Sequence, residues 1–392
     1  MEAPAARAIL SRENKILVRC ARRSLQEFDI AGLQEIVRGP VDWEGLLQLA
    51  DAHGLLPLLS EHLTQIEGGI VPPDTLTRLR DKSRECALRA LSRIAELNRL
   101  AEEFGRHEIP AIAHKGPVLA ARAYGNPVLR QYADLDFVVP QKFMPAVFDE
   151  IVKLGYEARL PREKFAETKA GRIPGEYAFR RGAEHMLVEF HTERTLRYFP
   201  RVPNLDEMIR RATTFPLNGK KVPAFSREDE LLMLAVHGAK DFWTRLIWIA
   251  DIAEVAKLPP PIQWTELFER AEEMRIGRML RLAIMLAHEI VGLEIPRHVE
   301  AVVEKDRVAG MLALAVREQL FSNAEASEGI LRRSMYRIRS VEGLWYGMKY
   351  WMRLATAPTE EDWSAIDVPM PLERSYTMLR PLRLWKKYSG SS

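Results

Sequence analysis

Two aspartates separated by one residue, Asp134 and Asp136, lie within an apolar, β-branched stretch of the chain. In a β-strand, residues i and i+2 project from the same face, so the two carboxylates would lie side by side while Leu135 faces a core. Adjacent like charges repel each other, and folding opposes the pair unless a cation or a proton lies between them. A divalent metal is the usual reason for such a pair, and Mg²⁺ bound in this way usually also contacts substrate phosphates. A solvated pair at a sheet edge is the alternative, and the apolar residues 137–139 argue against it.

Glu189 is the best candidate for a third carboxylate. It lies in an alternating stretch that would form a strand beside that of the aspartates, and it shares a face with His191 by the same period of two. Three carboxylates could hold two Mg²⁺ ions, or Mn²⁺ as the alternative ion, to activate an acceptor hydroxyl and neutralise a triphosphate. His191 would support the metal ligands or act as a base on the acceptor side, against the alternative of a structural histidine.

Lys115 and Gly116 lie at a predicted strand-to-helix turn upstream of the aspartates. Glycine lets the backbone approach a phosphate closely, and the N-terminus of the following helix favours anions. Lys115 would add a positive charge for a triphosphate, unless it is a surface lysine at a tight turn. Arg130 would contact phosphate or neutralise the acidic pair, and a structural ion pair is the equally weighted alternative.

Polar residues recur at three- and four-residue steps through 231–253, which predicts one mixed polar stripe along a helix. Such a stripe could line the acceptor side of a cleft, and a solvated face with local salt bridges is the alternative. The members of the stripe are His237, Lys240, Asp241, Thr244, Arg245 and Trp248.

The elements that would position these residues form a small α/β core between two helical regions. We expect a helical region over 1–105, the core over 106–224, a second helical region over 225–355 and a surface-packing tail over 356–392. The predicted strands span 109–114, 132–139, 176–181 and 185–191. Predicted helices span 14–36, 42–53, 55–63, 74–104, 117–125, 142–154, 226–258, 263–275, 277–292, 297–323 and 325–355.

The composition of the 392 residues is that of an ordinary globular protein, with 57 Lys and Arg against 54 Asp and Glu. This near balance does not by itself indicate nucleic-acid binding. Basic and aromatic residues interleave over 331–353, and more basic residues follow in the tail. They suggest RNA as a partner, against the alternative of an amphipathic helix with its aromatics in the core. The chain has two cysteines, which do not form a disulfide framework, and this favours a cytoplasmic protein. No apolar run reaches the ~20 residues of a membrane span.

The stretches 113–119, 124–127 and 134–139, together with Arg130, resemble the KG–R–DxD signature of a nucleotidyltransferase family in the DNA-polymerase-β-like superfamily. The resemblance continues into a helical block over 225–251 and covers about residues 40–387. It implies a small mixed sheet with helices on one side, and NMP transfer from an NTP with two Mg²⁺ ions. It also implies that the ions bind the carboxylates of Asp134, Asp136 and Glu189.

The same resemblance assigns triphosphate contacts to Lys115 and Arg130. Lys115-Gly116 replaces the superfamily's usual Gly-Ser turn, as in abortive-infection-type toxin nucleotidyltransferases. Thr192 and Asp241 depart from the nearer family on the acceptor side, so the resemblance does not supply the acceptor.

The predicted fold is therefore α+β, with a mixed-sheet nucleotidyltransferase core embedded between N-terminal and C-terminal helical regions. The predicted function is Mg²⁺-dependent transfer of an NMP from an NTP to an acceptor hydroxyl, with release of pyrophosphate. The acceptor would be a small molecule, a tRNA 3′ end or a protein. One alternative is a non-catalytic nucleotide-binding or scaffold protein that kept the fold. Another is a partner-dependent module, which an exposed apolar face on helix 74–104 would favour.

Overall fold

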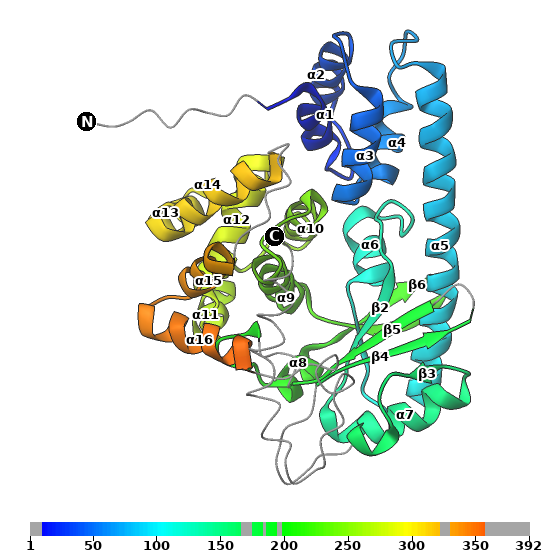
Figure 1. Ribbon diagram of the computed structural model, residues 1–392, viewed down its shortest axis with the longest axis vertical. Helices are drawn as coiled ribbons and strands as arrows, with labels where there is room; N and C mark the ends of the chain where they lie inside the picture. Colours follow the sequence, from blue (N-terminus) through cyan, green and yellow to red (C-terminus); the bar gives the residue numbers. More distant parts are fainter. Residues whose placement is uncertain (1–9, 166–174, 183–185, 194–197, 322–329, 357–392) are drawn as a thin grey trace.

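The fold is built on a mixed β-sheet with helices packed around it, which confirms the α+β prediction (Figure 1). The computed structural model describes residues 10–165, 175–182, 186–193, 198–321 and 330–356. Across the sheet the strands follow the order β3-β4-β5-β2-β1-β7-β6. Their bounds are β1 Ile112–His114, β2 Asp134–Val138, β3 Glu157–Ala158, β4 Glu176–Arg181, β5 Met186–His191, β6 Thr213–Leu217 and β7 Lys220–Ala224.

Helices precede, interrupt and follow these strands along the chain. N-terminal to the sheet are α1 Arg12–Cys20, α2 Glu27–Val37, α3 Trp43–His53, α4 Leu56–Leu63 and α5 Pro73–Arg106. Between the strands are α6 Gly116–Tyr124, α7 Met144–Lys153 and α8 Leu205–Arg211, with short 3₁₀ turns at Gln141–Phe143 and Arg162–Phe165. The C-terminal helices are α9 Arg227–Lys240, α10 Leu246–Ala256, α11 Trp264–Glu273, α12 Gly277–Val291, α13 Arg297–Glu304, α14 Arg307–Phe321, α15 Ile330–Arg339 and α16 Leu344–Thr356.

Strand β2 lies at the centre of the sheet and carries both aspartates. It pairs antiparallel with β1 and parallel with β5, and the register places Asp136 opposite His114 on one side and Glu189 on the other. Directly paired residues project from the same face of a sheet. The predicted placement of the Glu189 strand beside the aspartate strand is therefore confirmed.

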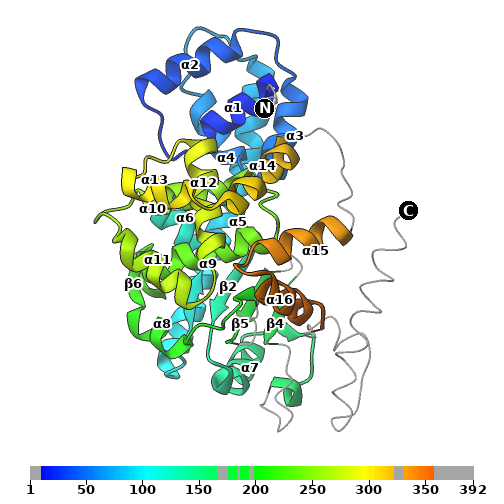
Figure 2. The same ribbon diagram turned by 90° about the vertical axis from the view of Figure 1, so that its left-hand side faces the viewer.

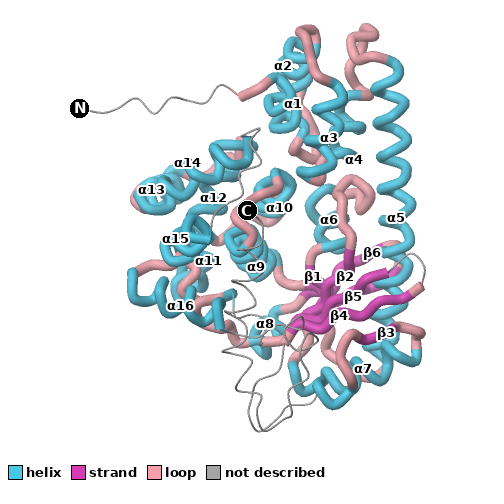
Figure 3. The backbone as a smooth tube through the Cα atoms, in the orientation of Figure 1, coloured by secondary structure: helices cyan, strands magenta, loops and turns pink. Residues whose placement is uncertain are grey.

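One face of the sheet is covered by α5 and α7 (Figure 3). Helix α5 begins with a proline in its first turn, and its apolar residues recur at helical spacing down to Phe104, whose ring meets the ring of Phe137 edge-on at 5.5 Å. Leu135 and Phe137 are fully buried in this core. Because side chains alternate along a strand, Asp134 and Asp136 point to the opposite face.

The N-terminal and C-terminal helices share a second apolar core on the other side of the sheet. Buried residues of α1, α3 and α4 belong to the same cluster as those of α9, α10, α12 and α14. Figure 2 looks from the side of the C-terminal helices, with α15 and α16 towards the viewer. The two predicted helical regions are thus joined through one core, and every described strand lies within the predicted 106–224 segment. The proposed domain boundaries themselves stay a prediction.

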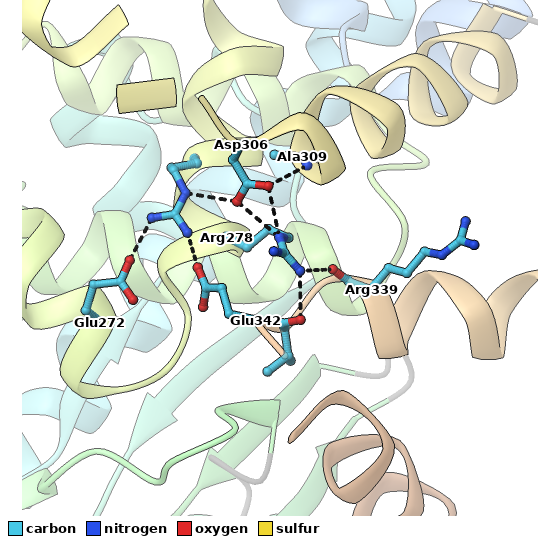
Figure 4. A network of polar contacts seen from close by, with 8 residues as sticks. Glu272, Arg278, Asp306, Ala309, Arg339 and Glu342 are labelled. Atoms are coloured by element: carbon cyan, nitrogen blue, oxygen red, sulfur yellow. Dashed lines mark hydrogen bonds and ion pairs between the residues drawn. The ribbon is translucent and has the colours of Figure 1, made fainter. Parts of the chain in front are cut away.

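An arginine network fixes the last helices to α12 (Figure 4). Arg278 and Arg281 both donate to Asp306, and Asp306 caps α14 by accepting from the backbone N–H of Ala309 at 3.0 Å. Arg278 also donates to the carbonyl oxygens of Arg339 and Val341, at 2.9 and 2.8 Å. These bonds hold the chain between α15 and α16 against α12.

Several predicted long helices are wrong because each is divided in two. The predicted helix 14–36 breaks between α1 and α2, where Gln26 and Asp29 form a capping box that starts a new helix. The predicted helix through 231–253 breaks after Lys240, because Phe242 and Trp243 adopt positive φ angles of 59° and 53°. Predicted helices 297–323 and 325–355 likewise each become two helices in the described residues.

The sequence interpretation also missed α8 and the β6–β7 hairpin, which extends the sheet through parallel pairing of Ala113 with Ala224. The starts of two predicted helices are confirmed: Asp42 caps α3 by accepting from the N–H of Gly45, and Ser226 caps α9 by accepting from the N–H of Asp229. The predicted surface tail falls at 357–392, outside the described residues. No helix in the described ranges is both long enough and apolar enough to span a bilayer.

Candidate functional site

A row of ionisable side chains crosses three strands on the face of the sheet opposite α5 and α7. His114 of β1, Asp136 of β2 and Glu189 of β5 are direct cross-strand neighbours. Asp136 is only 6% exposed and His114 only 4%. Such burial of charge requires nearby partners, and His191 supplies one.

His191 connects Asp136 and Glu189. Its Nε2 donates to Oδ1 of Asp136 at 2.8 Å and lies 3.9 Å from Oε2 of Glu189. Ligand atoms of these three residues all lie within 4.8 Å of one another, close enough to share one metal ion. Asp134 lies on the same strand face as Asp136, but it is not a member of this group of three.

Burial and mutual repulsion set the protonation of the carboxylates. Burial would raise the pKa of Asp136, but the positive charge of Lys115 and the hydrogen bond from His191 hold it well below its usual range. The pKa of Asp134 is raised by burial and by the charge of Asp136. Burial raises the pKa of Glu189 to about 7. The site thus favours a bound cation, which would stabilise all three charged carboxylates.

Lys115 and Gly116 form the turn between β1 and α6, as predicted. Both have positive φ angles, 56° and 44°, and Gly116 begins the helix. A Cβ atom at Gly116 would lie 3.4 Å from the backbone oxygen of Asp134, so the turn passes close to the aspartate strand. The helix N-terminus and the Lys115 ammonium are thereby brought to the edge of the carboxylate face.

The side chain of Lys115 contacts His237 of α9. Nζ of Lys115 lies 3.3 Å from Nδ1 of His237, and lysine is only a donor, so Nδ1 accepts. Burial and the charges of Lys115 and Lys240 hold the pKa of His237 well below its ordinary value, which keeps the ring neutral. The ring of Trp248 packs edge-on against the imidazole at 4.8 Å.

A small cavity of about 60 Å³ lies between the sheet and α9. It brings together four of the predicted site residues, Lys115, His191, His237 and Lys240. Lys240 stacks its ammonium over the ring of Tyr198 at 4.7 Å. The remaining lining residues are His114, Glu176, Tyr198, Phe199, Met233 and Val236.

Arg130 is held by a buried ion pair. Its Nε and Nη2 donate to both carboxylate oxygens of Asp251 on α10, at 2.8 to 3.1 Å, and the hydroxyl of Tyr124 donates to the same carboxylate at 3.0 Å. The structural ion pair weighed for Arg130 is therefore present. Its assignment to a triphosphate stays a prediction.

Arg245 does not join the other members of the predicted polar stripe. Because the helix breaks after Lys240, Arg245 precedes α10 and its Nε donates to the backbone oxygen of Ala52 at 3.0 Å. It lines a different pocket from His237 and Lys240. The single stripe is thus divided between two pockets.

Sequence reasoning missed three residues of this region. Glu176 pairs with His191 in the β4–β5 register and lines the small cavity. The available signal was its spacing: Glu176 lies two residues before Ala178, which pairs with Glu189, so both lie on the same face of the strand. His114 and Asp251 lay in the stretches used for the resemblance but received no role.

The donor set suits a hard divalent cation. Mg²⁺ and Mn²⁺ prefer carboxylate oxygens, and Asp134, Asp136 and Glu189 supply them on one face. The raised pKa of Glu189, and the 3.9 Å between its Oε2 and Nε2 of His191, fit a carboxylate whose charged form a cation would stabilise. These residues are therefore compatible with the metal that the fold implies.

Comparisons with known proteins identify a family for this chain. The model of a family described as an uncharacterised nucleotidyltransferase matches residues 39–292. A search of curated proteins gave no match. Solved structures that match include the crystal structure of an antigenic nucleotidyltransferase-like protein from Paracoccidioides brasiliensis. It has 16% identity and a TM-score of 0.31, over 57% of this chain and 92% of that chain. This score gives no basis for comparing residues. The family match spans more than half of the chain, so the protein belongs to this family of uncharacterised nucleotidyltransferases.

Proposed function

We propose that the protein transfers an NMP from an NTP to an acceptor hydroxyl in a reaction that depends on Mg²⁺ and releases pyrophosphate. The observation that carries the proposal is the alignment of Asp136 with Glu189 on paired strands, with Asp134 on the same face. The turn of Lys115 and Gly116 approaches the same strand. Carboxylates beside an anion-binding turn are what a reaction on a metal-bound triphosphate requires.

Asp134, Asp136 and Glu189 would hold the ions, which would neutralise the triphosphate and lower the pKa of the attacking hydroxyl. Asp136 is kept ionised by Lys115 and His191, so it is ready to bind a cation. Glu189 has a pKa near 7, so metal binding would displace its proton at lower pH.

Lys115 would place a positive charge on the phosphates as they lie against the first turn of α6. Its ammonium is directed by the neutral imidazole of His237, which accepts from it without adding a charge of its own. Such positioning, together with the oriented N–H groups of the turn, stabilises charge as it develops on the leaving pyrophosphate.

The acceptor would approach His191 and Lys240 on the α9 side of the sheet. The cavity there is about 60 Å³, well below the ~300 Å³ of common ligand pockets, so it fits one polar group of an acceptor rather than the whole molecule. A small alcohol, a tRNA 3′ end and a protein hydroxyl remain the acceptor classes. A steep fall of binding with salt would identify the polyanion among them.

The test is transfer of label from each α-labelled NTP, with Mg²⁺ and a cell extract as the source of acceptor. Asp134→Asn should abolish transfer without loss of the fold, and Asp149→Asn on the surface of α7 is the matched control. Full activity of Asp134→Asn would refute the metal site. Absence of both transfer and Mg²⁺-dependent NTP binding would favour the non-catalytic alternative. The size of the labelled product would give the acceptor class.

The two cysteines are unpaired and buried in the structure. Free thiols and a nucleoside triphosphate substrate both support placing the protein in the cytoplasm.

A further inference from the structure

A second pocket, of about 220 Å³, lies between α5, the segment before β2 and the start of α10. It shares no lining residue with the small cavity at His237. Four of its lining residues are arginines that come from three separate parts of the chain. They are Arg89 and Arg93 of α5, Arg130 before β2, and Arg245 before α10.

The positive charge of this arginine pocket is only partly balanced. Asp251 neutralises Arg130 within the buried ion pair. Arg89 is exposed, and its carboxylate partner at 3.7 Å, Glu85, is exposed as well. Arg245 forms an ion pair with no carboxylate of the described residues and instead contacts the backbone oxygen of Ala52. The pocket therefore presents guanidinium groups that an external anion could pair with.

Further contacts fix the position of Arg93 and Gln131 in the wall of this pocket. Arg93 donates through Nε to the backbone oxygen of Ala133 at 2.8 Å and through Nη1 to the backbone oxygen of Arg89 at 3.1 Å. Gln131 on the same wall donates to Asp51 at 3.1 Å. Burial and the charge of Arg130 lower the pKa of Arg245, and the charges of Asp51 and Asp251 offset that effect only in part, so a bound anion would add to them.

The pocket adjoins the carboxylate pair along the chain. Its wall includes Arg130, Gln131, Tyr132 and Ala133, which lead directly into Asp134 at the start of β2. Lys115 lies in the other cavity. The strand that carries the aspartates thus has the Lys115 cavity and the arginine pocket as separate neighbours.

We propose that the arginine pocket binds a phosphate group, carried by a nucleotide or by a nucleic acid, at a site separate from the turn of Lys115 and Gly116. Guanidinium groups match phosphate oxygens with paired hydrogen bonds, which is why arginine is preferred for this anion. The inference goes beyond the proposed function, because such binding needs neither the metal nor catalysis.

The first experiment is calorimetric titration of the full chain with inorganic pyrophosphate in EDTA, which removes any metal-dependent binding. Arg89→Gln and Arg245→Gln should each weaken binding about tenfold, since each removes a charge-assisted contact. Arg84→Gln is the matched control, because Arg84 is exposed on the same helix outside the pocket. Lys115→Gln reports separately on any pyrophosphate that binds at the turn of Lys115 and Gly116.

Two further titrations, with metal-free ATP and with a short single-stranded RNA, identify the source of the phosphate. Tighter binding of RNA, with a salt dependence that is reduced in Arg89→Gln, would assign the pocket to a nucleic-acid backbone. Equal or tighter binding of ATP would assign it to a nucleotide. Arg89 is exposed, so its variant should fold even if Arg245→Gln does not.

Three results would overturn the proposal. The first is failure of pyrophosphate, ATP and RNA all to bind. The second is loss of binding in Lys115→Gln with both arginine variants unaffected, which would move the phosphate to the turn. The third is equal weakening by Arg84→Gln, which would mean a diffuse attraction to the surface of α5.

Discussion

His191 donates a hydrogen bond from Nε2 to Oδ1 of Asp136, and this bond joins β5 to β2 at the centre of the carboxylate site. The contact fixes the orientation of Asp136 and helps keep it ionised despite its burial. We therefore expect His191→Ala to weaken Mn²⁺ binding about 10- to 100-fold, as loss of a group that orients a metal ligand does. Electron paramagnetic resonance of Mn²⁺ would measure the affinity.

Glutamine at the same position separates two roles of this histidine. His191→Gln keeps a donor for Asp136, so it should restore much of the affinity if His191 acts by orienting that carboxylate. An equal loss in both variants would instead make His191 a metal ligand, which its 3.9 Å distance from Glu189 also permits.

The Arg130–Asp251 ion pair should be needed for stability. Removing one partner leaves an unpaired buried charge, so Arg130→Met and Asp251→Asn should each lower the free energy of unfolding by about 3–5 kcal/mol. Denaturant titration would measure the loss. Arg162→Met breaks an exposed ion pair with Asp149, so it should hardly change the free energy of unfolding. Equal effects of the two kinds of variant would contradict a structural role for Arg130.

Local patterns predicted the elements of the site well, because the residues assigned to its chemistry also lie in the patterns that indicate strands and turns. The alternation around Asp134 and around Glu189 predicted two neighbouring strands with polar faces, and the structure shows that they pair in parallel. Lys115-Gly116 predicted the strand-to-helix turn, and its two positive φ angles show why glycine is useful there.

Tertiary packing decided what the sequence could not show. Helix α9 ends at Lys240 because Trp243 is buried against Gly238, where a Cβ atom would lie only 2.4 Å from the indole. Gly238 lies within the periodic pattern, two residues before the end of α9, and tryptophan is not a stop signal, so the sequence predicts one long stripe. The partner of Arg130, Asp251, is 121 residues away in sequence, so local reasoning could weigh an ion pair but could not name it.

Gly116→Ala should damage the turn that we assign to phosphate binding. Alanine is strained at a φ of 44°, so we expect a loss of about 1–2 kcal/mol in unfolding free energy together with weaker NTP binding. Gly105→Ala is the control, because a Cβ atom there meets nothing within 4 Å and its φ is not positive. It should be neutral or slightly stabilising. Unchanged NTP affinity in a folded Gly116→Ala protein would count against the turn as the triphosphate site.

His53 should make the protein sensitive to acid. Its ring is buried between α3 and α10, and Nδ1 accepts from the backbone N–H of Leu246 at 3.3 Å. Burial lowers the pKa of His53 from 6.5 to about 4. Between these values the unfolded chain binds a proton that the folded chain excludes. Stability is therefore full above pH 6.5 and is lost as the pH falls towards 4, by up to about 3 kcal/mol.

The variant His53→Gln isolates this contribution, because glutamine does not titrate yet can accept from Leu246. Unfolding free energies measured by denaturant from pH 7 to pH 4.5 should fall less steeply in the variant than in the wild type. The pKa values of His62, His114 and His237 are also lowered by burial, so both proteins should keep some acid sensitivity. Parallel pH profiles for the two proteins would mean that His53 is protonated in the folded state as easily as in the unfolded chain. That result would contradict its burial as a neutral acceptor.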